Sequence, residues 1–198
     1  MARKQRRGEE TAERLLDAAL ELYTSAGQPG FTVQAVSERS GVSLGSLYHH
    51  FGSFDGLAAA LYTRCMEQLC GETNAALLRT RTTRTGTRAF VESYLRFTEE
   101  HPDVARFVHA SSHASYLVTH AEQIRAAKEP MRKALAEWIG PRIAAGEIAP
   151  MPPEVIDVLV VGPVAETAAR WFSPFYDIDL RTAARVLPDR IWRSLRPD

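Results

Sequence analysis

The chain has 198 residues, of which 45% are hydrophobic, so it can bury the core of one large domain or two small ones. Its 24 basic and 24 acidic residues balance, and the net charge therefore neither favours nor excludes nucleic acid as a partner. No signal peptide or membrane-spanning apolar run is present. Cys65 and Cys70 point to different sides of a helical pattern and cannot bridge. Because no secretory pattern appears, we expect a protein of the reducing cytoplasm.

The chain opens with a basic segment and an amphipathic helix. Residues 1–8 are charged and lack an apolar period, so we expect a mobile arm that is either simply solvated or bound to DNA. Residues 11–26 carry a stripe of apolar side chains at helical spacing, and Gly27 ends the pattern. This helix should support the segment that follows it.

Residues 31–57 have the pattern of two short helices joined by a tight turn. Thr32 can cap the first helix and Ser43 the second, because their hydroxyls accept from free backbone N–H groups. Gly41 suits the left-handed backbone of the turn. Leu47 and Phe51 lie four positions apart and should face inward. The pattern predicts a helix-turn-helix.

The motif T-V-x-x-V-(x5)-G-V-S-x-G-(S)-L-Y-x-H-F resembles the DNA-binding signature of the tetracycline-repressor (TetR/AcrR) family of bacterial regulators. The resemblance implies that the second helix enters the major groove of DNA. It also implies a set of DNA-binding residues, namely Thr32, Ser43, Leu44, Gly45, Ser46, Tyr48, His49 and His50. Members of the family often carry a phosphate-contacting lysine where this chain has Phe54.

The charge of this segment is unusual for a DNA reader. Between Gly8 and Gly56 the basic residues are Arg14 and Arg39, against seven acids. Contacts to phosphate would therefore depend on the basic arm, on helix N-termini and on hydroxyl groups, all of which can bind phosphate. We expect modest non-specific affinity, with a shallow dependence on salt.

The rest of the chain predicts helices without strands. Residues 54–78 form a long connector helix, residues 79–88 an arginine- and threonine-rich loop, and further helices follow at 88–100, 102–110, 115–145, 153–172 and 180–195. The predicted fold is all-α, with an N-terminal arm and DNA-binding head at 1–53 and a helical ligand-binding and dimerisation domain at 54–198.

Three histidines support a competing hypothesis. His109, His113 and His120 would share one face of a continuous helix and could hold a zinc ion, so a metal-binding or enzymatic helical protein is the alternative. The glutamate of an HExxH hydrolase is missing, and ordinary polar histidines are the simpler interpretation. We predict no catalytic residue, no metal and no cofactor. A third hypothesis is a helical adaptor that retains the head without binding DNA.

The family resemblance implies a small-molecule inducer bound within the second domain and a homodimer. Aromatic and polar side chains that could line the inducer cavity are Tyr94, Phe97, Phe107, His113 and Trp138. Small and apolar groups that could form a four-helix dimer interface are Leu159, Gly162, Ala165, Ala169, Ala184, Leu187 and Ile191. We therefore interpret the chain as a ligand-responsive repressor of a palindromic operator, whose inducer, operator sequence and regulated genes the sequence does not name.

Overall fold

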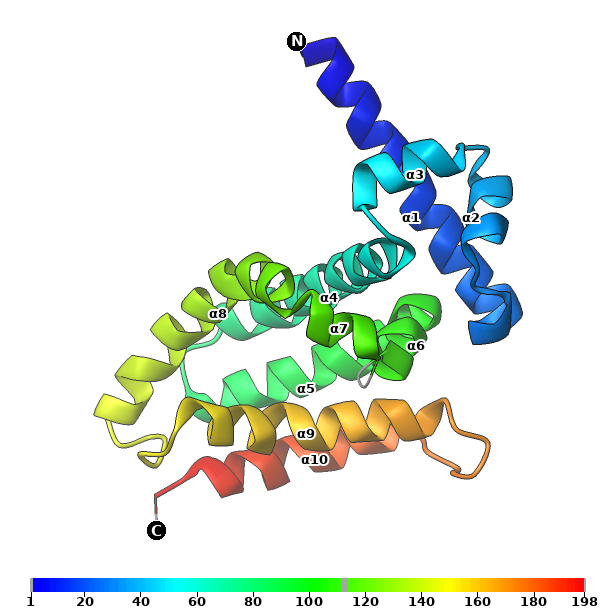
Figure 1. The fold of residues 1–198 in the computed structure, drawn as a ribbon. Helices are drawn as coiled ribbons and strands as arrows, with labels where there is room; N and C mark the ends of the chain where they lie inside the picture. Colours follow the sequence, from blue (N-terminus) through cyan, green and yellow to red (C-terminus); the bar gives the residue numbers. More distant parts are fainter. Residues whose placement is uncertain (1, 112–113, 198) are drawn as a thin grey trace.

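The computed structural model describes residues 2–111 and 114–197, which form ten helices and no strand (Figure 1). The all-α class predicted from the sequence is confirmed. The helices are α1 (Ala2–Gly30), α2 (Val33–Ser40), α3 (Leu44–Phe51), α4 (Phe54–Leu78), α5 (Thr83–Glu100), α6 (Pro102–Ser111), α7 (Ser115–Thr119), α8 (Ala121–Ala144), α9 (Pro153–Trp171) and α10 (Leu180–Leu195).

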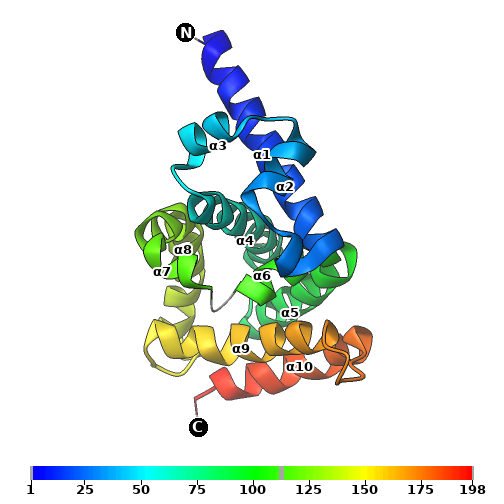
Figure 2. The ribbon, with the colours of Figure 1, turned by 45° about the vertical axis from the view of Figure 1, so that its right-hand side comes forward.

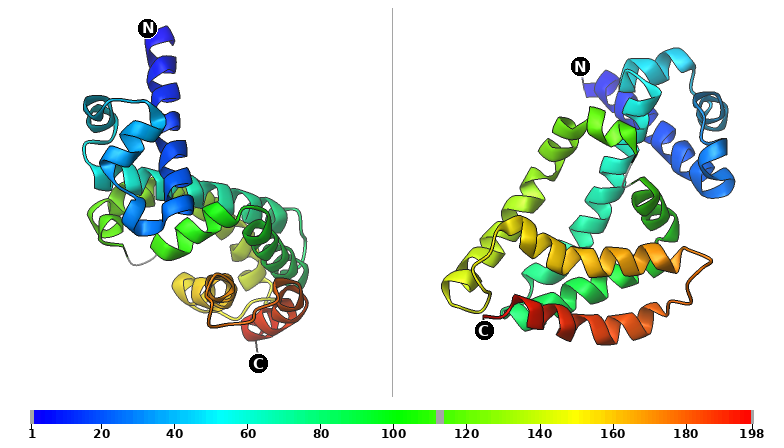
Figure 3. Two further views of the ribbon diagram at one scale, coloured as in Figure 1. Left: turned by 90° about the vertical axis from the view of Figure 1, so that its right-hand side faces the viewer. Right: turned by 60° about the horizontal axis from the view of Figure 1, so that its bottom comes forward.

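Helices α1–α3 make a small head at one end of the molecule, and α4 runs from it into a larger helical body (Figure 1). The connector α4 has α7 and α8 on one side and α6 on the other (Figure 2). Helices α9 and α10 lie side by side at the end farthest from the head (Figure 3). No helix among the described residues is long and apolar enough to cross a membrane.

Head and body share one hydrophobic core. A single cluster of buried side chains extends from Leu15 and Leu47 in the head through Leu61 of α4 to Phe97 and Ile191 in the body. The helix pattern therefore separates head from body more sharply than the packing does. We propose 1–53 and 54–198 as the limits of a DNA-binding part and a ligand-binding part, which share one hydrophobic core.

Two segments predicted to be non-helical are helical. Helix α1 begins at Ala2, so the arm continues the first helix upstream of the predicted start, and Gly27 kinks the helix instead of ending it. Helix α5 begins at Thr83, so half of the predicted arginine- and threonine-rich loop is helix, with Thr83 buried. The prediction overlooked a local cap, in which the Thr82 hydroxyl accepts from the N–H of Thr85, and a residue distant in sequence adds to this cap.

That residue is Glu147, in the turn after α8. Its carboxylate accepts hydrogen bonds from the backbone N–H of Thr83 at 3.0 Å and from the Thr83 hydroxyl at 2.8 Å. These bonds hold the pKa of the Glu147 carboxyl below its usual value. A carboxylate at a helix N-terminus accepts hydrogen bonds from free N–H groups. Its negative charge also interacts favourably with the positive end of the helix dipole, and both effects stabilise the first turn.

The continuous helix predicted for residues 115–145 is wrong. His120 interrupts it with a backbone of φ −109° and ψ 18°, and separates the short α7 from α8. Both cysteines are free thiols, as predicted. Burial raises the pKa of Cys65 to about 12, so this thiol is a core side chain and not a reactive one.

Candidate nucleic-acid interface

The pair α2–α3 is held by the caps that the sequence predicts. The N–H of Ala35 donates to the Thr32 hydroxyl at 3.3 Å, and the N–H of Ser46 donates to the Ser43 hydroxyl at 3.3 Å. Gly41 ends α2 with φ 64°, a left-handed conformation that favours glycine because a side chain would be strained there. The helix-turn-helix is therefore specified locally by a few residue types.

Helix α3 has one side in the core and one side in solvent. Leu47 is completely buried and Phe51 is half-buried, so these two side chains anchor the helix. Leu44 and Tyr48, at 38% and 45% exposure, project outward without a packing role that explains their size. Of the predicted DNA-binding set, Thr32, Ser43, Leu44, Gly45, Tyr48 and His49 are exposed, whereas Ser46 and His50 are half-buried.

The two arginines between Gly8 and Gly56 are engaged within the head. A guanidinium nitrogen of Arg14 donates to the carbonyl of Ser40 at 2.6 Å, which closes the end of α2 onto α1. Arg39 forms an exposed ion pair with Glu21 at 3.4 Å. Any phosphate contact of this segment would therefore come mainly from the hydroxyls, from the free N–H groups at the start of α3 and from basic residues near the chain start.

Phe54, which stands where a phosphate-contacting lysine is common, is the first residue of α4. Its ring centroid lies 4.8 Å from that of Phe31, in a contact that joins the α1–α2 connection to the connector helix. Phe31 in turn lies near Phe107 of α6, with centroids 6.2 Å apart. This position therefore supports packing between head and body.

The residues predicted to bind an inducer are not gathered around one cavity. Phe97 and Phe107 are fully buried in the core, and Tyr94 is nearly so. Trp138 lies near the far end of α8, where its indole N–H donates to the carbonyl of Thr80 at 3.3 Å. His113 lies outside the described residues. Two clefts on the described surface are lined by other side chains, and the ligand assignment stays a prediction.

A half-buried lysine of the body was missed by sequence reasoning. The ammonium of Lys128 lies 5.0 Å from the centre of the Tyr62 ring. Burial lowers the pKa of Lys128 and raises that of Asp157. Neither side chain forms an ion pair within 4.0 Å among the described residues. No sequence signal marks these residues, because lysine and aspartate at single helix positions are usually solvated.

The histidine hypothesis loses its geometric basis. His109 lies in α6 and His120 between α7 and α8, so the single helix that would have aligned them does not exist. His113 lies outside the described residues. Burial lowers the pKa of His109. Among the residues that the structure describes, no group of three or more His, Cys, Asp or Glu side chains is placed to hold a metal ion.

The residues predicted to form the dimer interface differ in their exposure to solvent. Ile191 is only 3% exposed and belongs to the core of the protomer, so its assignment to an interface was wrong. Gly162 is exposed, and Leu159, Ala165, Ala169, Ala184 and Leu187 are half-buried. Sequence reasoning missed the large apolar groups beside them: Val155, Val158 and Val186 are 42%, 66% and 51% exposed.

Comparison with known proteins agrees with this architecture. Residues 15–61 match the family model of bacterial regulatory proteins, tetR family. Over 66 residues the chain is 39% identical to the uncharacterized HTH-type transcriptional regulator TtgW of Pseudomonas putida, covering 32% of this chain and 49% of that protein. It is 37% identical over 59 residues to the HTH-type transcriptional regulator BetI of Burkholderia cenocepacia, covering 30% of each. The chain thus spans about half or less of the length of the curated relatives it matches.

Two solved structures resemble nearly the whole chain. A TetR family transcription regulator from Marinobacter aquaeolei has a TM-score of 0.78 at 16% identity, covering 98% of this chain and 100% of that one. The transcriptional regulator FadR from Bacillus subtilis, solved in complex with stearoyl-CoA, has a TM-score of 0.71 at 16% identity, covering 93% and 99%. At these identities the likeness shows a shared fold.

The protein is thus all-α, and one long helix joins a capped helix-turn-helix head to a larger helical body. Residues 15–61 match the bacterial regulatory proteins, tetR family, and the whole chain has the fold of TetR family regulators.

Proposed function

We propose that this protein is a cytoplasmic, ligand-responsive transcriptional regulator and not an enzyme, which represses by binding a palindromic operator as a homodimer. The observation that carries the proposal is the outer face of α3, where Leu44 and Tyr48 stand exposed on a helix anchored by the buried Leu47. A helix presented in this way fits the major groove of B-DNA. Selection of bound sequences from a random DNA pool tests the proposal, and no enriched sequence would contradict it.

Each predicted contact has a chemical role. The hydroxyls of Thr32, Ser43 and Tyr48 can donate to phosphate oxygens, and the first N–H groups of α3 point at the same backbone. Gly45 leaves open space beside the helix, which lets the DNA approach closely. Ser46, His49 and His50 would bind phosphates or bases from the remaining turns.

Replacing Tyr48 with phenylalanine is expected to weaken binding to every DNA sequence to a similar degree. The change removes one hydroxyl, and a hydrogen bond to a charged phosphate is worth about 1.5 kcal/mol, or roughly ten-fold per recognition helix. Tyr176→Phe is the matched control, because Tyr176 is similarly exposed but lies in the α9–α10 connection. Titrations of a selected operator and of unrelated DNA measure both effects, and an unchanged affinity would exclude a phosphate contact by Tyr48.

Leu44→Gln is expected to change which DNA sequences are preferred. Leucine has no hydrogen-bonding group and can distinguish bases only by apolar contact, for example with a thymine methyl group, whereas glutamine can bond the edge of adenine. Leu78→Gln, at a comparably exposed leucine at the end of α4, is the control. Sequence selection with both variants is the measurement. If Leu44→Gln returns the preference of the unmodified protein, Leu44 does not read bases.

The dimer would form through the outer faces of α9 and α10. Gly162 and Ala165 let a second helix approach closely, and the exposed Val155, Val158 and Val186 supply apolar area that a monomer would leave in water. Two helices from each protomer make an isologous interface, the commonest closed arrangement. Leu159, Ala169, Ala184 and Leu187 are the remaining proposed contacts.

The ligand would act through α4. A dimer must hold its two recognition helices about 34–36 Å apart to meet successive major grooves, and a tilt of α4 changes that separation. FadR from Bacillus subtilis, which shares the fold, was solved with stearoyl-CoA. We propose that the inducer of this protein binds in the body near Tyr94, where Tyr62 and Lys128 supply polar groups. It shifts the equilibrium only by its differential affinity for the two states, about 1–3 kcal/mol in typical cases.

A further inference from the structure

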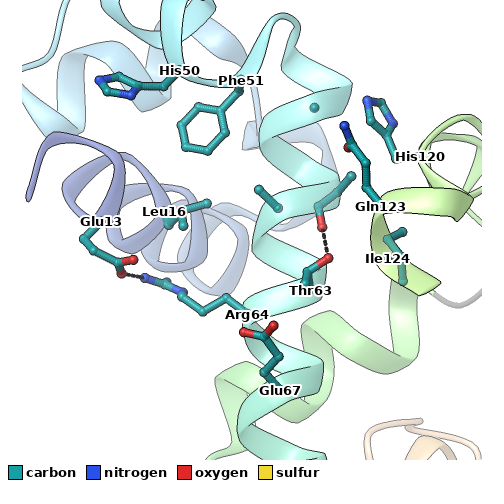
Figure 4. A pocket seen from close by; sticks show the side chains of 13 residues that line it. Glu13, Leu16, His50, Phe51, Thr63, Arg64, Glu67, His120, Gln123 and Ile124 are labelled. Atoms are coloured by element: carbon teal, nitrogen blue, oxygen red, sulfur yellow. Dashed lines mark hydrogen bonds and ion pairs between the residues drawn. The ribbon is translucent and has the colours of Figure 1, made fainter. Parts of the chain in front are cut away.

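A cleft on the described surface lies between head and body, apart from the interior residues proposed for the inducer. It has a volume of about 510 Å³, within the range of sites that bind small molecules. Its walls come from α1, α3, α4 and the α7–α8 junction (Figure 4). An occupant would therefore touch the head, the connector and the body at the same time.

The floor of the cleft is apolar and comes from three different elements. Phe51 ends α3, Leu16 lies on α1 and Ile124 lies on α8, and the small side chains of α4 complete the surface. Leu16 and Ile124 are 6% and 8% exposed, so they are fixed by the packing around them. A preformed apolar floor favours a ligand with an aromatic or branched alkyl part, because burying that part releases water.

The rim of the cleft carries an excess of negative charge. The guanidinium of Arg64 is already matched by two carboxylates, Glu13 at 3.0 Å and Asp17 at 2.8 Å. Glu67, one helical turn further along α4, forms no ion pair with any described residue. Arg64, Glu13, Asp17 and Glu67 together carry one positive and three negative charges, and the other polar side chains that line the cleft are Thr63, Gln123, His50 and His120. Charge complementarity thus favours a cation over an anion.

We propose that this cleft is a binding site for a small organic monocation. Its ammonium group lies beside Glu67 and its apolar part rests on Phe51, whose ring face also attracts a cation. Bound there, the cation bridges α3 to α8 and restrains the head relative to the body. The site is separate from the proposed inducer residues, so it provides a second input to the same protein.

The test uses two probes of similar size and opposite charge, benzyltrimethylammonium and phenylacetate, in calorimetric titrations of the full chain. The cation is expected to bind at one site per chain, and phenylacetate at least about ten-fold more weakly. Glu67→Gln is expected to weaken binding of the cation about five-fold or more. Glu137→Gln, an exposed unpaired glutamate of α8 away from the cleft, is the matched control and should change nothing.

A second variant is expected to bind the cation more tightly, so the test stays informative even if Glu67→Gln impairs folding. Gln123→Glu adds a second unpaired carboxylate to the same rim at an exposed position, and it is expected to tighten binding of the cation several-fold. Equal binding of the two probes, or no response to Glu67→Gln and Gln123→Glu, would overturn the proposal. The titrations contain no DNA, so their outcome is independent of whether the protein binds an operator.

Discussion

Gly162→Arg is expected to convert the protein from a dimer to a monomer and to weaken binding to a palindromic operator by about 100-fold or more. Gly162 is exposed on α9, and no heavy atom lies within 4 Å of the position its Cβ would take, so the protomer can accept a side chain there. One turn away, Val158 is 66% exposed. A charged side chain between two copies of this face would be buried without a partner. Loss of the dimer removes the second half-site contact, which contributes a factor of about 10²–10⁴ through effective concentration.

Light scattering at micromolar concentration and titration of a selected operator measure the two effects. Gly71→Arg is the matched control, because Gly71 is also exposed with open space around its Cβ but lies on α4. A dimer that survives Gly162→Arg and dissociates with Gly71→Arg would place the interface on α4. If both variants remain dimeric with unchanged operator affinity, the α9–α10 interface is wrong.

The head was predictable because its structure is specified by neighbours in sequence. Thr32, Ser43 and Ser53 cap the helices that follow them, and each does so through an N–H three residues ahead. Gly41 sets the turn by its own backbone. Local residue types of this kind leave few alternative conformations, so the pattern alone located α2, α3 and the start of α4 correctly.

The body was less predictable because its details depend on contacts between distant residues. Helix α5 starts at a local Thr82–Thr85 capping box that the prediction overlooked, and Glu147, which is 64 residues away, adds hydrogen bonds to its first turn. The body also lacks a sequence signal for its polar groups: Lys128 and Glu67 look like ordinary surface residues in a helical pattern. The cleft is formed by four elements, and the sequence does not say that α8 approaches α3. Phe97 and Phe107 were predicted to contact the inducer because they are aromatic. The structure shows that both are fully buried in the packed core.

Phe107 connects the head to the body, and Phe107→Ala is expected to lower the free energy of unfolding by about 3–5 kcal/mol. Phe107 is completely buried in α6, and its ring meets Tyr23 of α1 edge-on, with centroids 4.8 Å apart. The substitution leaves a cavity where head and body meet, and it also removes an aromatic contact. A loss of this size is a large fraction of the stability of an ordinary domain, which is about 5–15 kcal/mol.

Because one continuous core joins the two parts, we expect the unmodified protein to unfold in a single transition. Urea titration followed by tryptophan fluorescence reports the body, since Trp138, Trp171 and Trp192 all lie there. Amide hydrogen exchange in α3 reports the head. Phe107→Leu should cost much less because it keeps most of the volume, and Phe175→Ala should cost almost nothing because that ring is 88% exposed. If Phe107→Ala leaves the body transition unchanged while exchange in α3 accelerates, the head unfolds as a separate unit, and the contact of α6 with α1 does not join the two parts into one.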